Sequence, residues 1–325
     1  MAAITQFAKW QLALAIGHAV TAAIVFGVYA VHNKTAWIAP VHATYTMWSC
    51  TKNKTSCVPT EYRQALDSDV SIGILVMSFS VFSGMHHAVM CSTQYADHVF
   101  ETGVNLARWA DYAMSASLML LVNHIMFYAA PSVVEVVTVP CIQFLVIVAG
   151  FGSEALWAVA PRESKRPHHH TILFACACLP LVLLFGVQFL SMATSLSTEF
   201  AHPSSAPVLA PAVTDPNNPP DIVFAFVAFV AVCFAAFAVV HGCKIRGRKS
   251  IERCKFYEAV YGLLSFFTKI PLACLFAGTM ASRESEADKT GLYVFAIGVV
   301  VSAGFGAAMY WTYVRHIIID NQKNL

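Results

Sequence analysis

The chain has 325 residues, of which 58% are hydrophobic and only 12% are charged, and its mean hydropathy is +0.62. A soluble domain carries about 25% charged residues, so this composition excludes a soluble protein and predicts a polytopic membrane protein. The net charge of +2 says nothing about partners, and we expect no nucleic-acid partner.

Apolar runs predict eight membrane-spanning helices. A helix that rises 1.5 Å per residue needs about 20 residues to cross a hydrocarbon core of about 30 Å. Residues 130–132 alone separate the third and fourth runs, which predicts a tight helical hairpin. The predicted spans are, in chain order, 9–31, 71–93, 105–130, 133–160, 171–197, 221–243, 257–280 and 291–316.

The longest predicted loop, residues 32–70, is rich in aromatic residues and is compatible with a small β-ribbon lying on the membrane face. It also contains Cys50 and Cys57, within the polar sequence CTKNKTSC. Disulfides form in oxidising compartments, so a Cys50–Cys57 bond is a candidate if this loop is extracellular. The sequence alone does not establish the bond.

Basic residues are distributed unequally between the two sides of the predicted bundle. With the N-terminus in the cytoplasm, the cytoplasmic segments hold 13 of the 20 lysines and arginines and the outer segments hold 6. Cytoplasmic loops carry the excess of basic residues in membrane proteins. The count therefore favours a cytoplasmic N-terminus, and eight spans would place the C-terminus there too.

Lys269 lies in the middle of the seventh predicted span, 257–280. An ammonium group at that depth costs about 2.5–3.5 kcal/mol, and the side chain is too far from either end to reach water easily. Burial disfavours the charged form, which makes the amine a good nucleophile toward an aldehyde and favours a Schiff base. The alternative is a lysine paired with a carboxylate purely for packing.

The partner expected for Lys269 is an acid inside the membrane. By the predicted boundaries, Lys269 is the only basic residue deep in the bilayer, and Asp111 and Glu154 are the clear acidic candidates. Glu135 and Glu258 lie near span ends, where we expect them to meet water or headgroups.

The third span begins with the sequence Arg-Trp-Ala-Asp-Tyr, in which Arg108 and Asp111 share a helix face. Asp111 facing the bundle interior would neutralise a protonated Schiff base on Lys269, and Arg108 would steady the carboxylate. Ser115 and Ser265 place hydroxyls nearby that can relay protons or hold water. Small residues are also typical of ordinary contacts between membrane helices.

The sequence RWADYAMSAS at 108–117 resembles the third-helix signature of the heliorhodopsins. The sequence SFFTK at 265–269, followed by FAGT at 276–279, resembles their seventh-helix signature with the retinal-bearing lysine. The resemblance covers about residues 5–282. It implies an all-α, seven-helix rhodopsin-like bundle over residues 1–282 that binds retinal, all-trans in the dark.

The resemblance also implies roles for individual residues. Lys269 matches the lysine that binds retinal, and Asp111 matches the counterion, which is usually glutamate in the family. His18 and His87 match two histidines of a polar network near the Schiff base, and Ser83 lies one turn before His87. A lone histidine in a membrane helix is otherwise a packing residue.

Other matches concern the walls of the pocket. Ser265 matches a serine near the Schiff base, and Met119 matches a residue that lines the polyene. His86 beside His87 leaves open which ring faces the Schiff base. A polyene needs an apolar, aromatic pocket, for which the fifth and sixth spans offer Pro180, Phe185, Gln188, Phe189, Phe224, Phe226, Phe229, Phe234 and Phe237.

The chain departs from the family in two places. Glu154 lies inside the fourth span, where it either passes a proton or reaches water at the inner end, and the nearby Arg162 and Glu163 favour water. Residues 283–325 contain the eighth predicted helix, 291–316, and a short cytoplasmic tail. This helix would pack on the bundle, build an oligomer interface or face lipid.

The resemblance favours a retinal-binding photoreceptor with a slow photocycle and a signalling output, and not an enzyme. The alternative is a light-activated proton transporter or channel, and a third reading is a retinal-free carrier with a buried Lys–Asp pair. Besides membrane lipid, we expect a homodimer. Basic residues in 244–255 and 162–170 would bind anionic lipid or a cytoplasmic signalling partner, although positive-inside charge alone also explains them.

Overall fold

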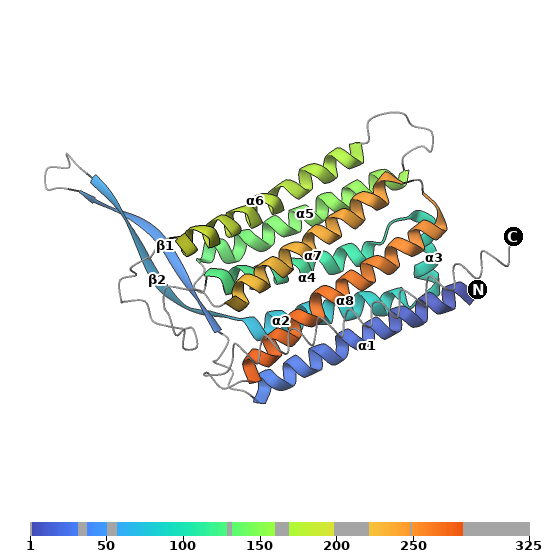
Figure 1. The fold of residues 1–325 in the computed structure, drawn as a ribbon, viewed down its shortest axis with the longest axis horizontal. Coiled ribbons are helices and arrows are strands. Elements are labelled where there is room, and N and C mark those ends of the chain that lie inside the picture. The colour runs from blue at the N-terminus through green and yellow to red at the C-terminus, as the bar shows by residue number, and fades with distance from the viewer. Residues whose placement is uncertain are drawn as a thin grey trace.

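The computed structural model describes residues 2–31, 38–50, 57–128, 132–159, 169–197, 221–247 and 249–281. Seven long helices within these ranges lie side by side in one bundle (Figure 1). They are α1 (Ala2–Val31), α2 (Ile72–Met90), α4 (Leu106–Tyr128), α5 (Val133–Val159), α6 (His169–Ser197), α7 (Asp221–Arg246) and α8 (Ile251–Ala281). The seven-helix bundle over the first seven predicted spans is confirmed, and the predicted eighth helix lies outside the described residues.

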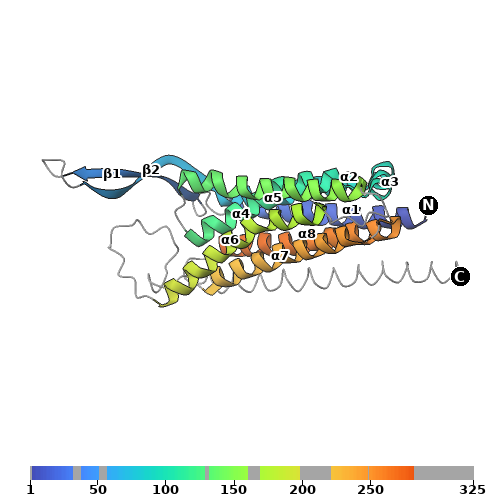
Figure 2. The same ribbon diagram turned by 90° about the horizontal axis from the view of Figure 1, so that it is seen from above.

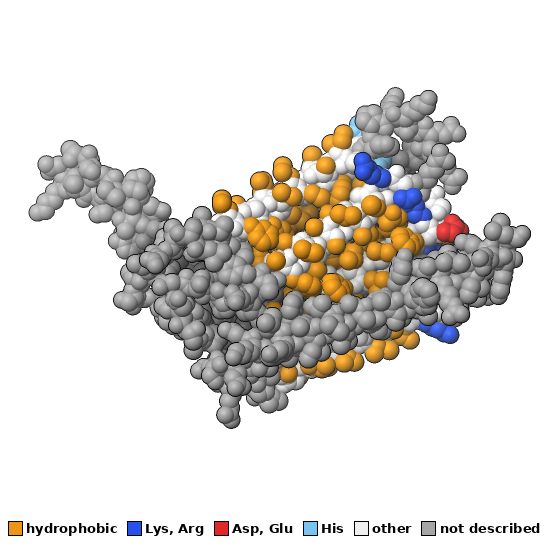
Figure 3. Space-filling view, viewed as in Figure 1, with side chains coloured by type: hydrophobic (Ala, Val, Ile, Leu, Met, Phe, Trp, Pro, Cys, Tyr) orange, Lys and Arg blue, Asp and Glu red, His pale blue; other side chains and the backbone are white. Residues whose placement is uncertain are grey.

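Six of these helices, all but α4, are long and apolar enough to cross a membrane. The remaining long helix, α4, has 23 residues and is also long enough to cross a membrane. It carries several buried polar residues, which make it less apolar. Figure 3 shows hydrophobic side chains spread over the outer face of the bundle, while the basic and acidic side chains visible in that view gather near one end. An apolar belt of this kind is what a lipid-facing surface requires.

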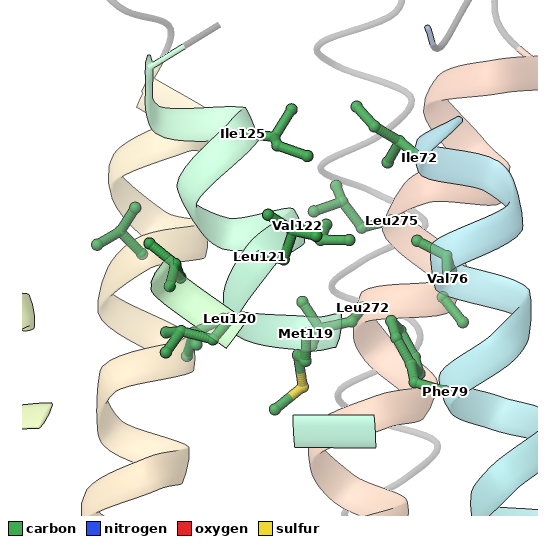
Figure 4. Close-up of a cluster of buried hydrophobic side chains, with 14 of the residues drawn as sticks. Ile72, Val76, Phe79, Met119, Leu120, Leu121, Val122, Ile125, Leu272 and Leu275 are labelled. Atoms are coloured by element: carbon green, nitrogen blue, oxygen red, sulfur yellow. The ribbon is translucent and has the colours of Figure 1, made fainter. Parts of the chain in front are cut away.

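The long helices form a closed ring in which α8 packs on both α7 and α1. Two buried apolar clusters fill the ring, one toward each end. One cluster lies toward the end where β1 and β2 attach, which we call the ribbon end, and Figure 4 shows part of it. The other lies where α1 begins and α3 packs, which we call the α3 end.

The short helix α3 (Thr93–Thr102) was not predicted from the sequence. Its N-cap is Ser92, and it ends at Gly103, whose φ of 78° is a left-handed conformation that favours glycine. Phe100 packs edge-on against Phe7 of α1, with ring centroids 5.0 Å apart. A helix of ten residues is too short to produce the long apolar run on which the span prediction rests.

The predicted β-ribbon is present as the antiparallel pair β1 (Ile38–Cys50) and β2 (Cys57–Ser71). It crosses the end of the bundle at a steep angle to the helices and projects beyond it (Figures 1 and 2). Its register places Cys50 opposite Cys57. Opposite residues in such a pair have Cα atoms about 4.5–5.5 Å apart, within the range a disulfide needs. The bond itself stays a prediction.

Candidate functional site

The amine of Lys269 lies in a polar group of side chains from α2, α4 and α8. The residue is 2% exposed. Its Nζ donates hydrogen bonds to the hydroxyls of Ser83 and Ser115, the latter at 2.7 Å, and lies 3.2 Å from both carboxylate oxygens of Asp111. The structure therefore brings together four of the residues that the sequence analysis assigned to one site.

The carboxylate of Asp111 is buried and held by polar groups. Ser83 donates a hydrogen bond of 2.8 Å to its Oδ1 atom. The Nδ1 atom of His86 lies 3.7 Å from its Oδ2 atom. With Lys269 as a third partner, the charge of Asp111 is compensated without access to water, as a buried carboxylate requires.

The structure separates the two adjacent histidines of α2. His86 faces Asp111, whereas His87 is hydrogen-bonded through Nδ1 to the Oε1 atom of Gln11 at 2.6 Å. The rings of His87 and His18 are stacked with centroids 5.4 Å apart. The predicted pair of His18 and His87 is thus a structural unit, while His86 is the histidine beside the carboxylate.

A cavity opens beside Lys269, between α4, α5, α6, α7 and α8. The space between these helices, including the part open to the outside, is about 720 Å³. Met119, which is 2% exposed, belongs to its wall, as do Phe234 and Phe237 of the predicted aromatic set. The wall is almost entirely apolar or aromatic, and its other residues include Trp109, Tyr112, Ser115, Ala116, Ile147, Phe174, Leu181 and Tyr261.

Other predicted residues lie elsewhere. Ser265 is buried one turn before Lys269, but its hydroxyl has no hydrogen-bond partner among the residues whose positions are described. Gln188 pairs with Asn123 at 3.1 Å, and Phe189 is 41% exposed on the outside of the bundle. The side chains of Phe224 and Phe226 lie outside the described part of the chain.

The sequence model of the heliorhodopsin family matches residues 7–280. The chain belongs to the heliorhodopsin family. No curated protein matches it. Membership makes the protein a multi-pass integral membrane protein and a light-sensing rhodopsin with retinal as its chromophore.

The residues around the cavity of this heliorhodopsin fit a retinal group. Lys269 offers a primary amine at the wall of an apolar cavity. Its Nζ atom is the nitrogen that would bond to the aldehyde carbon of retinal. Asp111 is close enough to balance a positive charge on that nitrogen, and Ser115 is in hydrogen-bonding distance. The aromatic side chains across the cavity are suited to packing against a conjugated chain.

A second group of buried charges lies in this heliorhodopsin toward the α3 end. Lys244 of α7 lies 3.1 Å from Glu154 of α5 and 3.0 Å from Glu258 of α8. Arg108 of α4 pairs with Glu154, and its Nε atom lies 3.6 Å from Glu258. We call these four side chains the charge cluster. It contains two cations and two carboxylates and is therefore electrically balanced.

The charge cluster corrects several expectations. Lys269 is not the only buried basic residue, because Arg108 is fully buried and Lys244 is 1% exposed, although both lie near helix ends. Glu154 and Glu258 do not reach water, because they are 0% and 3% exposed. Arg108 contacts these two glutamates, and no contact with Asp111 is found among the described side chains, so it does not steady the Asp111 carboxylate directly.

His241 of α7 connects the cavity to the charge cluster. It lines the cavity, and its Nε2 atom lies 2.8 Å from the hydroxyl of Ser153. Since that hydroxyl donates to the carbonyl of Gly150, it accepts a hydrogen bond from the Nε2–H group. Nδ1 then accepts from the hydroxyl of Tyr261 at 3.1 Å and lies 3.8 Å from Glu154.

The sequence did carry a signal for these connections. Asn105 and Arg108, His241 and Lys244, and Glu258 and Tyr261 are pairs spaced three residues apart, which places each pair on one helix face. The side-chain amide of Asn105 donates to Glu258 at 2.7 Å. Hydropathy does not reveal these pairs, because each lies near a predicted span end. From the sequence alone we therefore expect water or headgroups at Glu258 and a contact with Asp111 for Arg108.

Proposed function

We propose that this heliorhodopsin is a sensory photoreceptor in which Lys269 holds retinal as a protonated Schiff base and Asp111 is its counterion. The observation that carries the proposal is the position of the Lys269 amine at the cavity wall, 3.2 Å from both oxygens of Asp111. A carboxylate at this distance favours the protonated nitrogen. The bound retinal supplies light absorption and a change of shape on isomerisation.

The side chains around the Schiff-base nitrogen have two roles: some hold its proton and others accept the proton when it leaves. Asp111, Ser83 and Ser115 surround the nitrogen and retain the proton in the dark, when we expect retinal to be all-trans. His86, 3.7 Å from Asp111, is positioned to take up a proton that reaches the carboxylate. His18 and His87, stacked behind it, extend the polar network toward α1.

The output of the proposed receptor is a slow rearrangement at the α3 end. His241 touches both the cavity and the charge cluster, so a change in the cavity wall would alter the ion pairs of Lys244 and Glu154. We propose that the α3 end faces the cytoplasm and that its basic side chains bind anionic lipid or a signalling partner. A homodimer is part of the same proposal.

Asp111→Asn tests the counterion role. Wild-type protein mixed with all-trans retinal should form a visible band at neutral pH. Without the carboxylate the nitrogen holds its proton less tightly, so the variant should absorb in the near ultraviolet at neutral pH and regain the visible band on acidification. Absorption spectra across a pH titration measure this.

Asp111→Glu is the matched control for this experiment, because it keeps the charge and lengthens the side chain. It should retain a visible band at neutral pH, at a shifted wavelength. If Asp111→Asn keeps the wild-type spectrum and titration, Asp111 is not the counterion.

A second candidate function is light-driven proton transport, favoured by the complete burial of Glu154 between the cavity and the α3 end. We expect no sustained photocurrent from the wild type in a voltage-clamped cell, because a sensor needs no continuous path. The matched control for Glu154→Gln is Glu135→Gln, because the side chain of Glu135 is 42% exposed. Transport would be established instead if a sustained current were abolished by Glu154→Gln and left intact by Glu135→Gln. Surface expression of each variant is measured in parallel.

A further inference from the structure

One polar side chain in the cavity wall, on the side opposite Lys269, has an oxygen atom without a hydrogen-bond partner among the described residues. Gln143 of α5 is 1% exposed and lines the cavity. Its Oε1 atom is buried and has no hydrogen-bond partner among the described residues. An unpaired buried polar atom is costly, and in native proteins such atoms usually find a partner. A ligand in the cavity is the natural source of that partner.

The position of Gln143 decides which part of a ligand it would meet. Lys269 belongs to α8, whereas α5 packs on α4 and α6, and both views of the fold place α5 on the other side of the bundle from α8 (Figures 1 and 2). A long ligand attached to Nζ of Lys269 and lying in the cavity therefore directs its free end toward α5 and α6. In a retinoid, that free end is the ring.

The remaining polar groups of the cavity wall differ from Gln143 in position or in chemistry. His241 is engaged with Ser153 and Tyr261. Trp109 and Tyr112 also have unpartnered polar atoms, but both lie on α4, and the ring of Tyr112 is 5.7 Å from Nζ of Lys269. Both are hydrogen donors through N–H and O–H, whereas the unpartnered atom of Gln143 is an acceptor.

We propose that Gln143 accepts a hydrogen bond from a hydroxyl group on the ring of the bound retinoid, so that the cavity selects a ring-hydroxylated retinal over unsubstituted retinal. This rests on the proposed attachment of retinal to Lys269. An unsubstituted ring leaves the amide oxygen unpaired in an apolar wall, whereas a hydroxyl pairs it. A site built to bond a hydroxyl discriminates against the analogue that lacks it.

The test is a competition between retinoids for the full-length protein, purified from cells that make no retinal. The protein is mixed with equal amounts of retinal and 3-hydroxyretinal, washed, and treated with hydroxylamine, and the released oximes are quantified by chromatography. We expect the wild type to enrich the hydroxylated compound about tenfold, the factor that one buried hydrogen bond supplies. The ring ketone 4-oxoretinal has no hydrogen to donate and should not be enriched.

Variants assign the preference to one side chain. Gln143→Leu and Gln143→Met remove the acceptor while keeping the volume similar, and both should bind the two retinoids equally. Gln188→Met is the matched control, because Gln188 is also a buried amide, pairs with Asn123 and is absent from the cavity wall. It should keep the wild-type preference.

The results separate this inference from the proposed function. If the wild type binds both retinoids without preference, or if Gln143→Leu keeps the preference, the inference is overturned while retinal binding stands. Equal enrichment of 4-oxoretinal would also overturn it. If no retinoid is retained by folded protein, the proposed function fails and the inference fails with it.

Discussion

Lys269→Ala should abolish the visible absorption band that forms when the purified protein is mixed with all-trans retinal. The bond to retinal requires a primary amine at the cavity wall, and among the side chains that line the cavity only Lys269 has one. The expected loss is therefore complete. Absorption spectra of both proteins measure it, and borohydride reduction followed by peptide mass analysis should locate the retinal on Lys269 in the wild type.

Two controls separate loss of chemistry from loss of folding. Lys269→Ala leaves the buried carboxylate of Asp111 without its cation, so Lys269→Ala combined with Asp111→Asn removes both charges and should fold but stay colourless. Lys9→Ala changes an exposed lysine of α1 and should keep the band. A folded Lys269→Ala protein with the wild-type band contradicts the attachment site. If the wild type forms no band, Lys269 and Asp111 are an ion pair with a structural or transport role.

Lys244→Met should destabilise the protein by about 3–5 kcal/mol, the usual cost of removing one partner from a buried ion pair. The change leaves Glu154 and Glu258 with Arg108 as their remaining cation in the charge cluster. Two carboxylates that share one cation in a site without water repel each other. The free energy of unfolding is measured by titrating the detergent-solubilised protein with sodium dodecyl sulfate.

Arg246→Met is the matched control, because Arg246 lies on the same helix end but is exposed. Exposed charges contribute little to stability, so this variant should unfold close to the wild type. Lys244→Met combined with Glu258→Gln restores the charge balance and should recover part of the loss. Equal stability of Lys244→Met and Arg246→Met would show that the charge cluster does not stabilise the bundle.

The sequence predicted the parts of the fold that depend on local pattern. Apolar runs located the first seven spans to within a few residues at most ends, because burial in lipid demands such runs whatever the tertiary packing. The aromatic loop anticipated the pair of β1 and β2. The helix α3 was missed because its apolar residues, such as Val99 and Phe100, are too few for a span and pack only once α1 is beside them.

The site divides in the same way. The Lys269–Asp111 pair could be predicted because Lys269 lies in the middle of an apolar run, where only an opposite charge can compensate it, and Asp111 lies inside another predicted span. Apolar runs did not predict the charge cluster, because Lys244 and Glu258 lie near span ends that usually meet water, and only the three-residue spacing of its polar residues indicated it. Their burial depends on α4, α5, α7 and α8 converging at the α3 end, and hydropathy along one helix carries no information about that convergence.

The apolar cluster at the ribbon end has an electrical consequence. It begins about one turn beyond Lys269, where Leu272 and Leu275 of α8 meet Val122 of α4 and Val76 of α2 (Figure 4). Among the described residues this layer contains no buried carboxylate, whereas the opposite half holds Asp111 and the charge cluster. The described part of the ribbon-end half thus offers no buried carboxylate that could carry a proton across it. Charge displaced from the Lys269–Asp111 pair would shift back and forth across part of the bilayer's thickness, giving a brief polarisation in place of steady conduction.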